Sequence, residues 1–276
     1  MKAVAITSGK GGVGKTNVTV NLGLALADAG RRCLLLDADM GLANLDVVLG
    51  WASHRTLLDV IEQRVSLESA IARVEPRLHL LPSPSGVLKL ERLGEDQRAR
   101  LVEDIERLRD DYDVLLVDTG SGLTENVLFF CDWADGVVLV TEPEPTALTD
   151  GYALVKVLSQ SYDVTNIALL VNQVESSTQA AQIRDRFGSV CARHLNLSLP
   201  YLGNVLSDPT LPQAVAERRP VFRADSNSPA SDCFRRIAAR FDEALTCDPA
   251  QLRDRRYWTA RRREQLQRKI SLDPML

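Results

Sequence analysis

The segment Ser8–Thr16 contains four glycines, two lysines and a threonine, and it directly follows an apolar run. That run, Lys2–Thr7, is typical of a buried strand, and helically spaced apolar residues predict a helix over Thr16–Ala29. A glycine turn at such a junction lets backbone N–H groups surround an anion, to which the helix adds its positive N-terminal end. The GxxxxGK[ST] spacing of Gly9–Thr16 therefore predicts a phosphate-binding loop for a nucleoside triphosphate.

The residue types in this loop have separate expected tasks. Lys15 is expected to reach the β- and γ-phosphates, and the Thr16 hydroxyl is a natural ligand for Mg²⁺. A second cation, Lys10, stands among the glycines next to the expected anion. We predict nucleotide contacts from the loop and the residue after it: Gly9, Lys10, Gly11, Gly12, Val13, Gly14, Lys15, Thr16 and Asn17.

Carboxylates end two further apolar runs. Asp37 and Asp39 close the second run, and Asp118 closes Val114–Val117. Hydrolysis of a γ-phosphate needs a water held in line and Mg²⁺ to neutralise the developing charge. We predict that Asp118 holds Mg²⁺ through a water and the Thr16 hydroxyl. The spacing from Asp118 to Gly122 places the Gly122 amide at the γ-phosphate.

The elements that must position these residues alternate along the chain. Strand-like runs occur at Ala3–Ile6, Cys33–Leu36, Leu78–Leu81, Val114–Val117, Val137–Val140, Ile167–Val171 and Leu199–Val205, and helix-length segments at Glu95–Arg109, Thr146–Gln160 and Gln179–Leu195. Continuous apolar strands alternating with helices predict an α/β fold: a three-layer sandwich with a mostly parallel, twisted sheet covered by helices on both faces. Ligands of such sheets bind beyond the carboxyl ends of the strands, where the predicted site residues lie.

The motif Lys10-Gly-Gly-Val-Gly-Lys-Thr16 resembles the deviant Walker A motif of the MinD/ParA family of P-loop ATPases. The resemblance implies ATP and Mg²⁺ as ligands and an ATP-dependent homodimer, in which Lys10 crosses to the nucleotide of the other subunit. The stretch Asp37–Asp46 is similar to the family pattern DADxGLxNLD. That similarity implies that Asp39 positions the attacking water and that Asp37 supports the metal-side network. The implied catalytic residues are Lys10, Lys15 and Asp39, and the implied metal residues are Thr16, Asp37 and Asp118.

Recognition of the base depends more on the resemblance. Asn172 follows the predicted strand Ile167–Val171, where the family has an asparagine that contacts adenine, and an amide offers adenine both a donor and an acceptor. Asp208 occupies the position of a second nucleotide contact. The family usually has Ile-Pro-x-Asp there, whereas this chain has Val205-Leu-Ser-Asp208. No NKxD motif specifies guanine, so ATP follows from the family resemblance.

Three segments resemble the FlhG/FleN branch of the family, which controls flagellar number. They are Arg55–Ile61, Leu81–Gly86 and, most specifically, Glu144–Lys156 with the sequence EPTALTDGYALVK. The resemblance implies control of flagellar number or placement through a flagellar transcriptional activator or a flagellar GTPase of the signal-recognition-particle type. Some members carry an N-terminal extension that stimulates such a GTPase; because Met1 adjoins the first strand, we expect no such segment here.

Composition fits an ordinary globular protein. The 276 residues are 45% hydrophobic and 25% charged, with a net charge of −4. Five scattered cysteines form no CxxC pair, which argues against zinc and a disulfide framework and favours a reducing cytoplasm. We also expect no signal peptide and no membrane span, because no apolar run reaches about 18 residues.

We predict one ATPase domain over residues 1–246, followed by a basic, helical tail over 247–276. Between Pro249 and Ile270 there are eight Arg or Lys residues against Asp254 and Glu264. Three interpretations stay open: peripheral contact with anionic lipid at the inner membrane face or a cell pole, contact with DNA, which ranks below lipid, or packing of Trp258 against the domain.

Two other functions also remain open. A DNA-partitioning ATPase of the ParA type would bind nucleoid DNA through the basic tail, with an affinity that falls steeply with salt. A weakly hydrolysing, nucleotide-gated scaffold would serve another polar machine. The favoured prediction is an ATPase that acts as a molecular switch, with slow, partner-stimulated hydrolysis.

Overall fold

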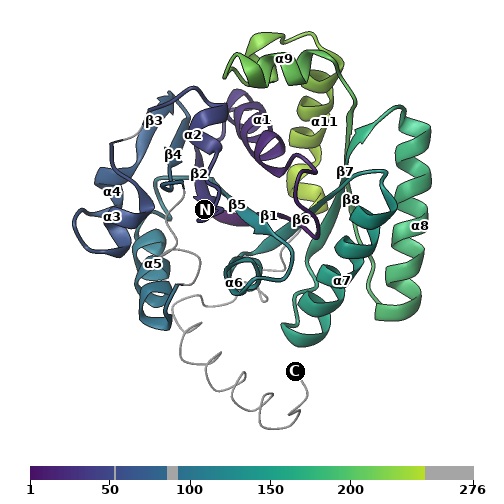
Figure 1. Ribbon diagram of the computed structural model, residues 1–276, viewed down its shortest axis with the longest axis horizontal. Helices are drawn as coiled ribbons and strands as arrows, with labels where there is room; N and C mark the ends of the chain where they lie inside the picture. Colours follow the sequence, from purple (N-terminus) through teal and green to yellow (C-terminus); the bar gives the residue numbers. More distant parts are fainter. Residues whose placement is uncertain (53, 86–92, 246–276) are drawn as a thin grey trace.

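The computed structural model describes residues 1–52, 54–85 and 93–245, and the predicted tail lies outside the described residues. An eight-stranded sheet forms the centre, in the order β3-β4-β2-β5-β1-β6-β7-β8 (Figure 1). Its strands are β1 (Lys2–Ser8), β2 (Cys33–Ala38), β3 (Ala72–Glu75), β4 (Leu78–Leu81), β5 (Val114–Ser121), β6 (Gly136–Thr141), β7 (Ile167–Val174) and β8 (Tyr201–Leu206). Every pairing is parallel except β3 with β4, which confirms the predicted mostly parallel sheet.

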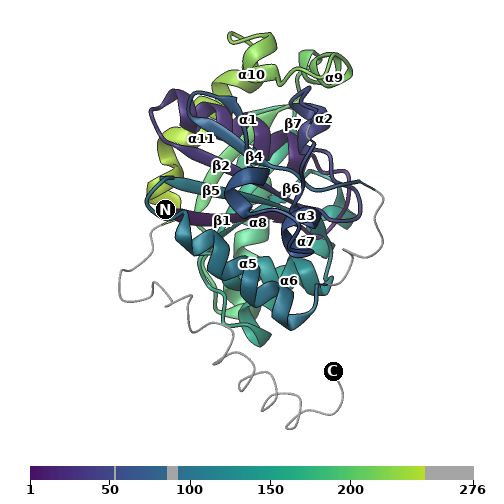
Figure 2. The same cartoon turned by 90° about the vertical axis from the view of Figure 1, so that its left-hand side faces the viewer.

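Helices cover both faces of this sheet. They are α1 (Lys15–Asp28), α2 (Leu45–Val48), α3 (Leu57–Ile61), α4 (Leu67–Ala70), α5 (Glu95–Arg107), α6 (Glu125–Trp133), α7 (Pro145–Ser161), α8 (Ser177–Leu195), α9 (Thr210–Ala216), α10 (Val221–Ala224) and α11 (Pro229–Ala244). Helices α1 and α11 pack on one face, whereas α5, α6, α7 and α8 pack on the other. Figure 2 shows α2, α9 and α10 together at one end of the molecule.

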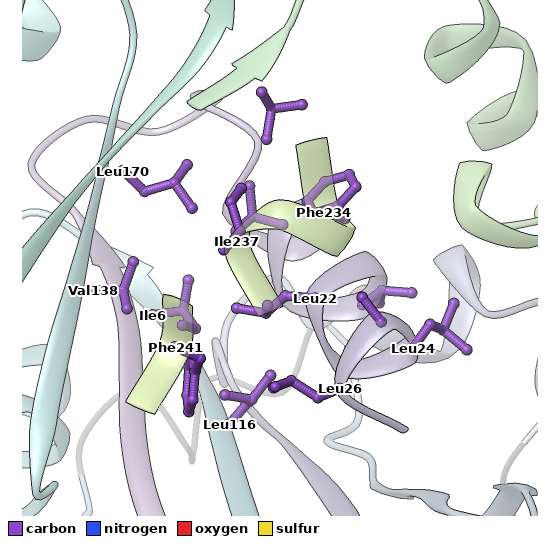
Figure 3. Close-up of a cluster of buried hydrophobic side chains, with 14 of the residues drawn as sticks. Ile6, Leu22, Leu24, Leu26, Leu116, Val138, Leu170, Phe234, Ile237 and Phe241 are labelled. Carbon is purple, nitrogen blue, oxygen red and sulfur yellow. The ribbon is translucent and has the colours of Figure 1, made fainter. Parts of the chain in front are cut away.

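Alternation within the strands assigns side chains to the two faces. Along β1, Val4 and Ile6 face α1 and α11, whereas Ala3 and Ala5 face the opposite helices. Figure 3 shows Ile6 among side chains from α1, α11 and neighbouring strands, including Phe234 and Phe241. The strands are therefore buried on both sides, as their continuous apolar runs predict.

Two differences from the predicted elements concern the site and the edge of the sheet. Strand β7 continues to Val174, so Asn172 lies inside the strand and not after it. Strand β3 was also not predicted: its four residues alternate as Ala-Arg-Val-Glu, but the run is short and none of them is fully buried. It is an edge strand that pairs antiparallel with β4.

The cysteines within the described chain are all free and buried: Cys33, Cys131, Cys191 and Cys233. Burial raises the pKa of Cys33 and of Cys131 to about 12. Among the residues described, none of the helices combines the length and apolarity that crossing a membrane would require.

Candidate functional site

The phosphate loop connects β1 to α1 at the carboxyl end of the sheet. Gly12 and Gly14 have φ values of 84° and 88°, a region that favours glycine. The side chain of Asn172 lies below the loop, because its Nδ2 donates to the Val13 carbonyl oxygen at 2.8 Å. On Gly14, a Cβ would lie 2.5 Å from that Nδ2, so the loop is packed closely onto β7.

Helix α7 closes the loop from another side. A Cβ on Gly9 would lie 2.1 Å from the Asp150 carbonyl carbon and 2.3 Å from the Gly151 nitrogen. The loop backbone therefore rests directly on the backbone of α7. Gly122, with φ of 78°, donates its N–H to the Ser8 carbonyl at 3.0 Å and brings the end of β5 to the same place.

Lys15, Thr16 and Asp118 form the centre of the site. Parallel register places Asp118 of β5 opposite both Ile6 of β1 and Asp37 of β2. Asp118 is buried, and burial raises its pKa to about 6, while hydrogen bonds from Thr16 and Thr19 and the charge of Lys15 oppose the shift. Burial also lowers the pKa of Lys15, against the nearby Asp118 and Asp39 carboxylates.

Thr19 is a second hydroxyl at this carboxylate, one turn beyond Thr16. It is fully buried, and its Oγ1 lies 3.0 Å from Asp118 Oδ1 and 3.0 Å from the Lys15 carbonyl oxygen. A threonine has a single hydroxyl proton, so Thr19 can donate to only one of these acceptors at a time. Sequence reasoning missed this residue; the signal was a second hydroxyl at the i+3 position after Thr16, on the same side of the helix.

Asp37 and Asp39 have different surroundings. The Asp37 carboxylate accepts N–H bonds from Asn44 and Leu45, both at 3.0 Å, and from Asp39 at 3.2 Å. It is nevertheless buried beside Asp118, and burial raises its pKa well above the usual range. Asp39 faces the end of β5, since a Cβ on Gly120 would lie 3.6 Å from Asp39 Oδ1.

Lys10 is held by acids of its own chain. Its Nζ contacts Glu144 and lies 3.6 Å from Glu142 Oε1, on the segment between β6 and α7. The hydrogen bond to Glu144 raises the pKa of Lys10. Sequence reasoning singled out the segment that begins at Glu144 but did not pair it with Lys10, because the two positions are 134 residues apart.

The Asp208 carboxylate accepts hydrogen bonds at the starts of two helices. Its Oδ1 accepts from the N–H and hydroxyl of Thr210 at 2.9 and 2.7 Å, and its Oδ2 accepts from Ala230 N–H at 3.0 Å. The carboxylate thus joins the start of α9 to the start of α11. The nucleotide contact of Asp208 stays a prediction. In this structure its carboxylate holds the two helix starts together.

The arrangement fits a magnesium nucleotide. Mg²⁺ usually binds through one or two carboxylates, water and substrate phosphates, and Asp118 with the Thr16 hydroxyl supplies such a partial set. Within the described chain, no group of three or more His, Cys, Asp or Glu residues that could hold a metal ion is found. The positive-φ glycines and the open N-terminal end of α1, where Gly14 supplies no side-chain cap, suit a phosphate.

Comparison with known proteins agrees with this site. The family described as "AAA domain" (AAA_31) matches residues 1–171. "Antiactivator FleN" of Pseudomonas aeruginosa is 40% identical over 242 residues, which cover 88% of this chain and 86% of its own. "Flagellum site-determining protein YlxH" of Helicobacter pylori is 34% identical, covering 86% of this chain and 80% of its own.

A solved structure supports the same relationship. The septum site-determining protein MinD of Pyrococcus horikoshii, complexed with Mg-ADP, superposes with a TM-score of 0.74 at 28% identity. The match covers 88% of this chain and 96% of the other. In that protein the bound ligand is an adenine nucleotide with Mg²⁺. The chain belongs to the family of P-loop ATPases that includes FleN, YlxH and MinD.

Proposed function

We propose that this protein is an ATP-hydrolysing switch that controls flagellar number or placement. The observation that carries the proposal is the joint presence of the Lys10–Thr16 loop, Asp39 and Asp118 at one sheet edge, in a chain 40% identical to an antiactivator named FleN. The relative YlxH is named a flagellum site-determining protein, which also supports a role in flagellar placement.

The chain's own residues divide the work of hydrolysis. Backbone N–H groups of the loop and the ammonium of Lys15 bind and orient the phosphates. Thr16 and Asp118 would hold Mg²⁺, which neutralises charge on the transferred phosphate when bound. Asp39 faces this point from the end of β2 and orients the attacking water. Asp37 supports it indirectly, through the backbone amides of the loop that carries Asp39.

In this proposal, Lys10 makes the contact between the two subunits of the dimer. Its side chain is about one-third exposed at the mouth of the loop, so it can reach the nucleotide of a second subunit. To do so it must leave Glu142 and Glu144, which hold it within its own chain. ATP-dependent pairing of two subunits then creates the surface that a partner recognises. That partner is a flagellar transcriptional activator or a flagellar GTPase of the signal-recognition-particle type.

The test is the size of the purified protein with ADP and with non-hydrolysable ATP. We expect a monomer with ADP, a dimer with the ATP analogue, and a monomer in both cases for Lys10→Ala. Lys156→Ala, which removes an exposed lysine from α7, is the matched control and should behave as wild type. Dimerisation of Lys10→Ala at the wild-type nucleotide concentration would refute the assignment.

Peripheral attachment is a separate part of the proposal. The sequence 247–276 is rich in arginine, and attraction of each cation to anionic lipid contributes about 1 kcal/mol. We infer that this segment attaches the ATP dimer to the inner membrane face. Sedimentation with phosphatidylserine vesicles, with and without residues 247–276, tests this. Binding to duplex DNA that requires residues 247–276, without binding to the vesicles, would instead favour the DNA-partitioning function.

A further inference from the structure

The loop between β2 and α2 carries Asp39 and is fixed at both ends. At its start and finish the Asp37 carboxylate accepts the backbone N–H groups of Asp39, Asn44 and Leu45. Within it, Met40 and Ala43 are buried, and Asp39 remains partly exposed towards the site. The position of Asp39 therefore depends on how firmly this short loop is held.

A second loop holds the carbonyl groups of the first. The Ser83 hydroxyl donates to the Asp37 carbonyl at 2.7 Å, and the Ser85 hydroxyl donates to the Ala43 carbonyl at 2.6 Å. These two carbonyls lie on either side of Asp39 in the sequence. Both serines belong to Pro82–Ser85, directly after β4, the strand that pairs with β2.

The donor loop is anchored at its start. The Pro82 carbonyl accepts the Leu57 N–H at 2.7 Å, and the register of β2 with β4 places Leu36 opposite Leu81. Pro82 and Pro84 have fixed φ angles, so the backbone next to each serine is conformationally restricted. Such a loop loses little conformational freedom when it forms both hydrogen bonds.

We propose that Pro82–Ser85 is a positioning element for Asp39, with Ser85 as the positioning residue most open to test. The inference rests on the proposed role of Asp39 in hydrolysis. It also gives a task to a motif that resembles the flagellar branch and that the nucleotide site itself does not use. Ser85 acts on the rate of hydrolysis and contributes nothing to nucleotide affinity.

The test compares Ser85→Ala with Ser85→Thr, which keeps the hydroxyl. Single-turnover hydrolysis at saturating ATP should slow about five- to tenfold in Ser85→Ala, the effect of one lost neutral hydrogen bond, and should recover in Ser85→Thr. Affinity for Mg-ADP and ATP-dependent dimer formation should stay at wild-type values. Ser159→Ala is the control, because it also removes a hydroxyl that bonds a backbone carbonyl, on α7.

Coupling to Asp39 separates this proposal from the proposed function. Asp39→Ala combined with Ser85→Ala should hydrolyse no more slowly than Asp39→Ala alone, since Ser85 acts through Asp39. A full additional loss in the double variant, an unchanged rate in Ser85→Ala, or no recovery in Ser85→Thr would overturn the positioning role. Wild-type hydrolysis by Asp39→Ala would instead refute the proposed role of Asp39 itself.

Discussion

At the residue scale, the site keeps opposite charges in an apolar environment. Asp118 and Lys15 both have a pKa moved by burial toward the neutral form, and each is partly restored by the other. The Asp118 carboxylate depends on hydroxyl donors, because a buried carboxylate without partners is costly. Thr16 and Thr19 provide those donors from successive turns of α1.

We predict that Thr19 keeps Asp118 oriented when the Thr16 hydroxyl turns to the metal. Thr19→Val should weaken Mg-ADP binding roughly ten- to a hundredfold, as expected for one lost hydrogen bond to a charged group. ADP binding without Mg²⁺ should hardly change, and Thr19→Ser should retain wild-type affinity. Isothermal titration with and without Mg²⁺ measures both. Equal losses in the two conditions would show that Thr19 only supports the fold.

At the scale of elements, the closest contact in the site is between the phosphate loop and α7. Gly9 leaves no room for a Cβ against the backbone of Asp150 and Gly151. Lys10, the next residue, is held by Glu142 and Glu144 just before the same helix. The phosphate loop is therefore joined to α7 by backbone packing at Gly9 and, just before the helix, by the ion pairs of Lys10.

Gly9→Ala tests this close contact. The added methyl group meets backbone atoms that cannot move aside, so we expect ADP affinity to fall at least tenfold and the melting temperature to decrease. Gly188→Ala is the matched control, because nothing lies within 4 Å of its added Cβ on α8. It should keep full affinity and stabilise the helix by about 0.5–1 kcal/mol. Normal ADP binding by Gly9→Ala would contradict the rigid contact.

The sequence predicted the elements whose patterns are local. The glycine spacing of Gly9–Thr16 and the continuous apolar runs were sufficient for the fold, now confirmed by the sheet order and the solved relative. Strand β3 escaped prediction because its Ala-Arg-Val-Glu alternation spans only four residues, none of them fully buried, and the strand forms at the sheet edge by pairing with β4.

Contacts between distant segments could not be predicted. The pairing of Lys10 with Glu142 and Glu144, and that of Ser85 with the Ala43 carbonyl, join positions far apart in sequence. Asp208 shows the opposite case: a residue chosen by position in a motif proves to be engaged with Thr210 and Ala230. Only the packed chain reveals which acceptors and donors a side chain meets.

At the scale of the whole molecule, the site reduces the stability of the free protein. In the folded chain Asp118 keeps its proton up to about pH 6, whereas an unfolded aspartate releases it near pH 4. Because the folded state binds more protons in this interval, the free energy of unfolding falls as the pH rises from about 4 to about 6. Above pH 6 the ionised Asp118 costs about 2–3 kcal/mol.

Asp118→Asn should therefore raise the stability of the nucleotide-free protein at pH 7.5, by about 2 kcal/mol, and have little effect at pH 4. The same variant should lose the additional stabilisation that Mg²⁺ gives in the presence of ADP. Urea unfolding at the two pH values, with and without Mg-ADP, measures both effects. A variant less stable than wild type at pH 7.5 would contradict the prediction.

The four buried sulfurs give the molecule a further property. Cys33, Cys131, Cys191 and Cys233 belong to strands and helices on both faces of the sheet, and none reaches solvent in the folded chain. A thiol reagent can attack them only when their surroundings open, because each sulfur is buried in the folded chain. Each sulfur is thus an intrinsic reporter of local opening, so the rate of alkylation of each one would map where bound nucleotide tightens the fold.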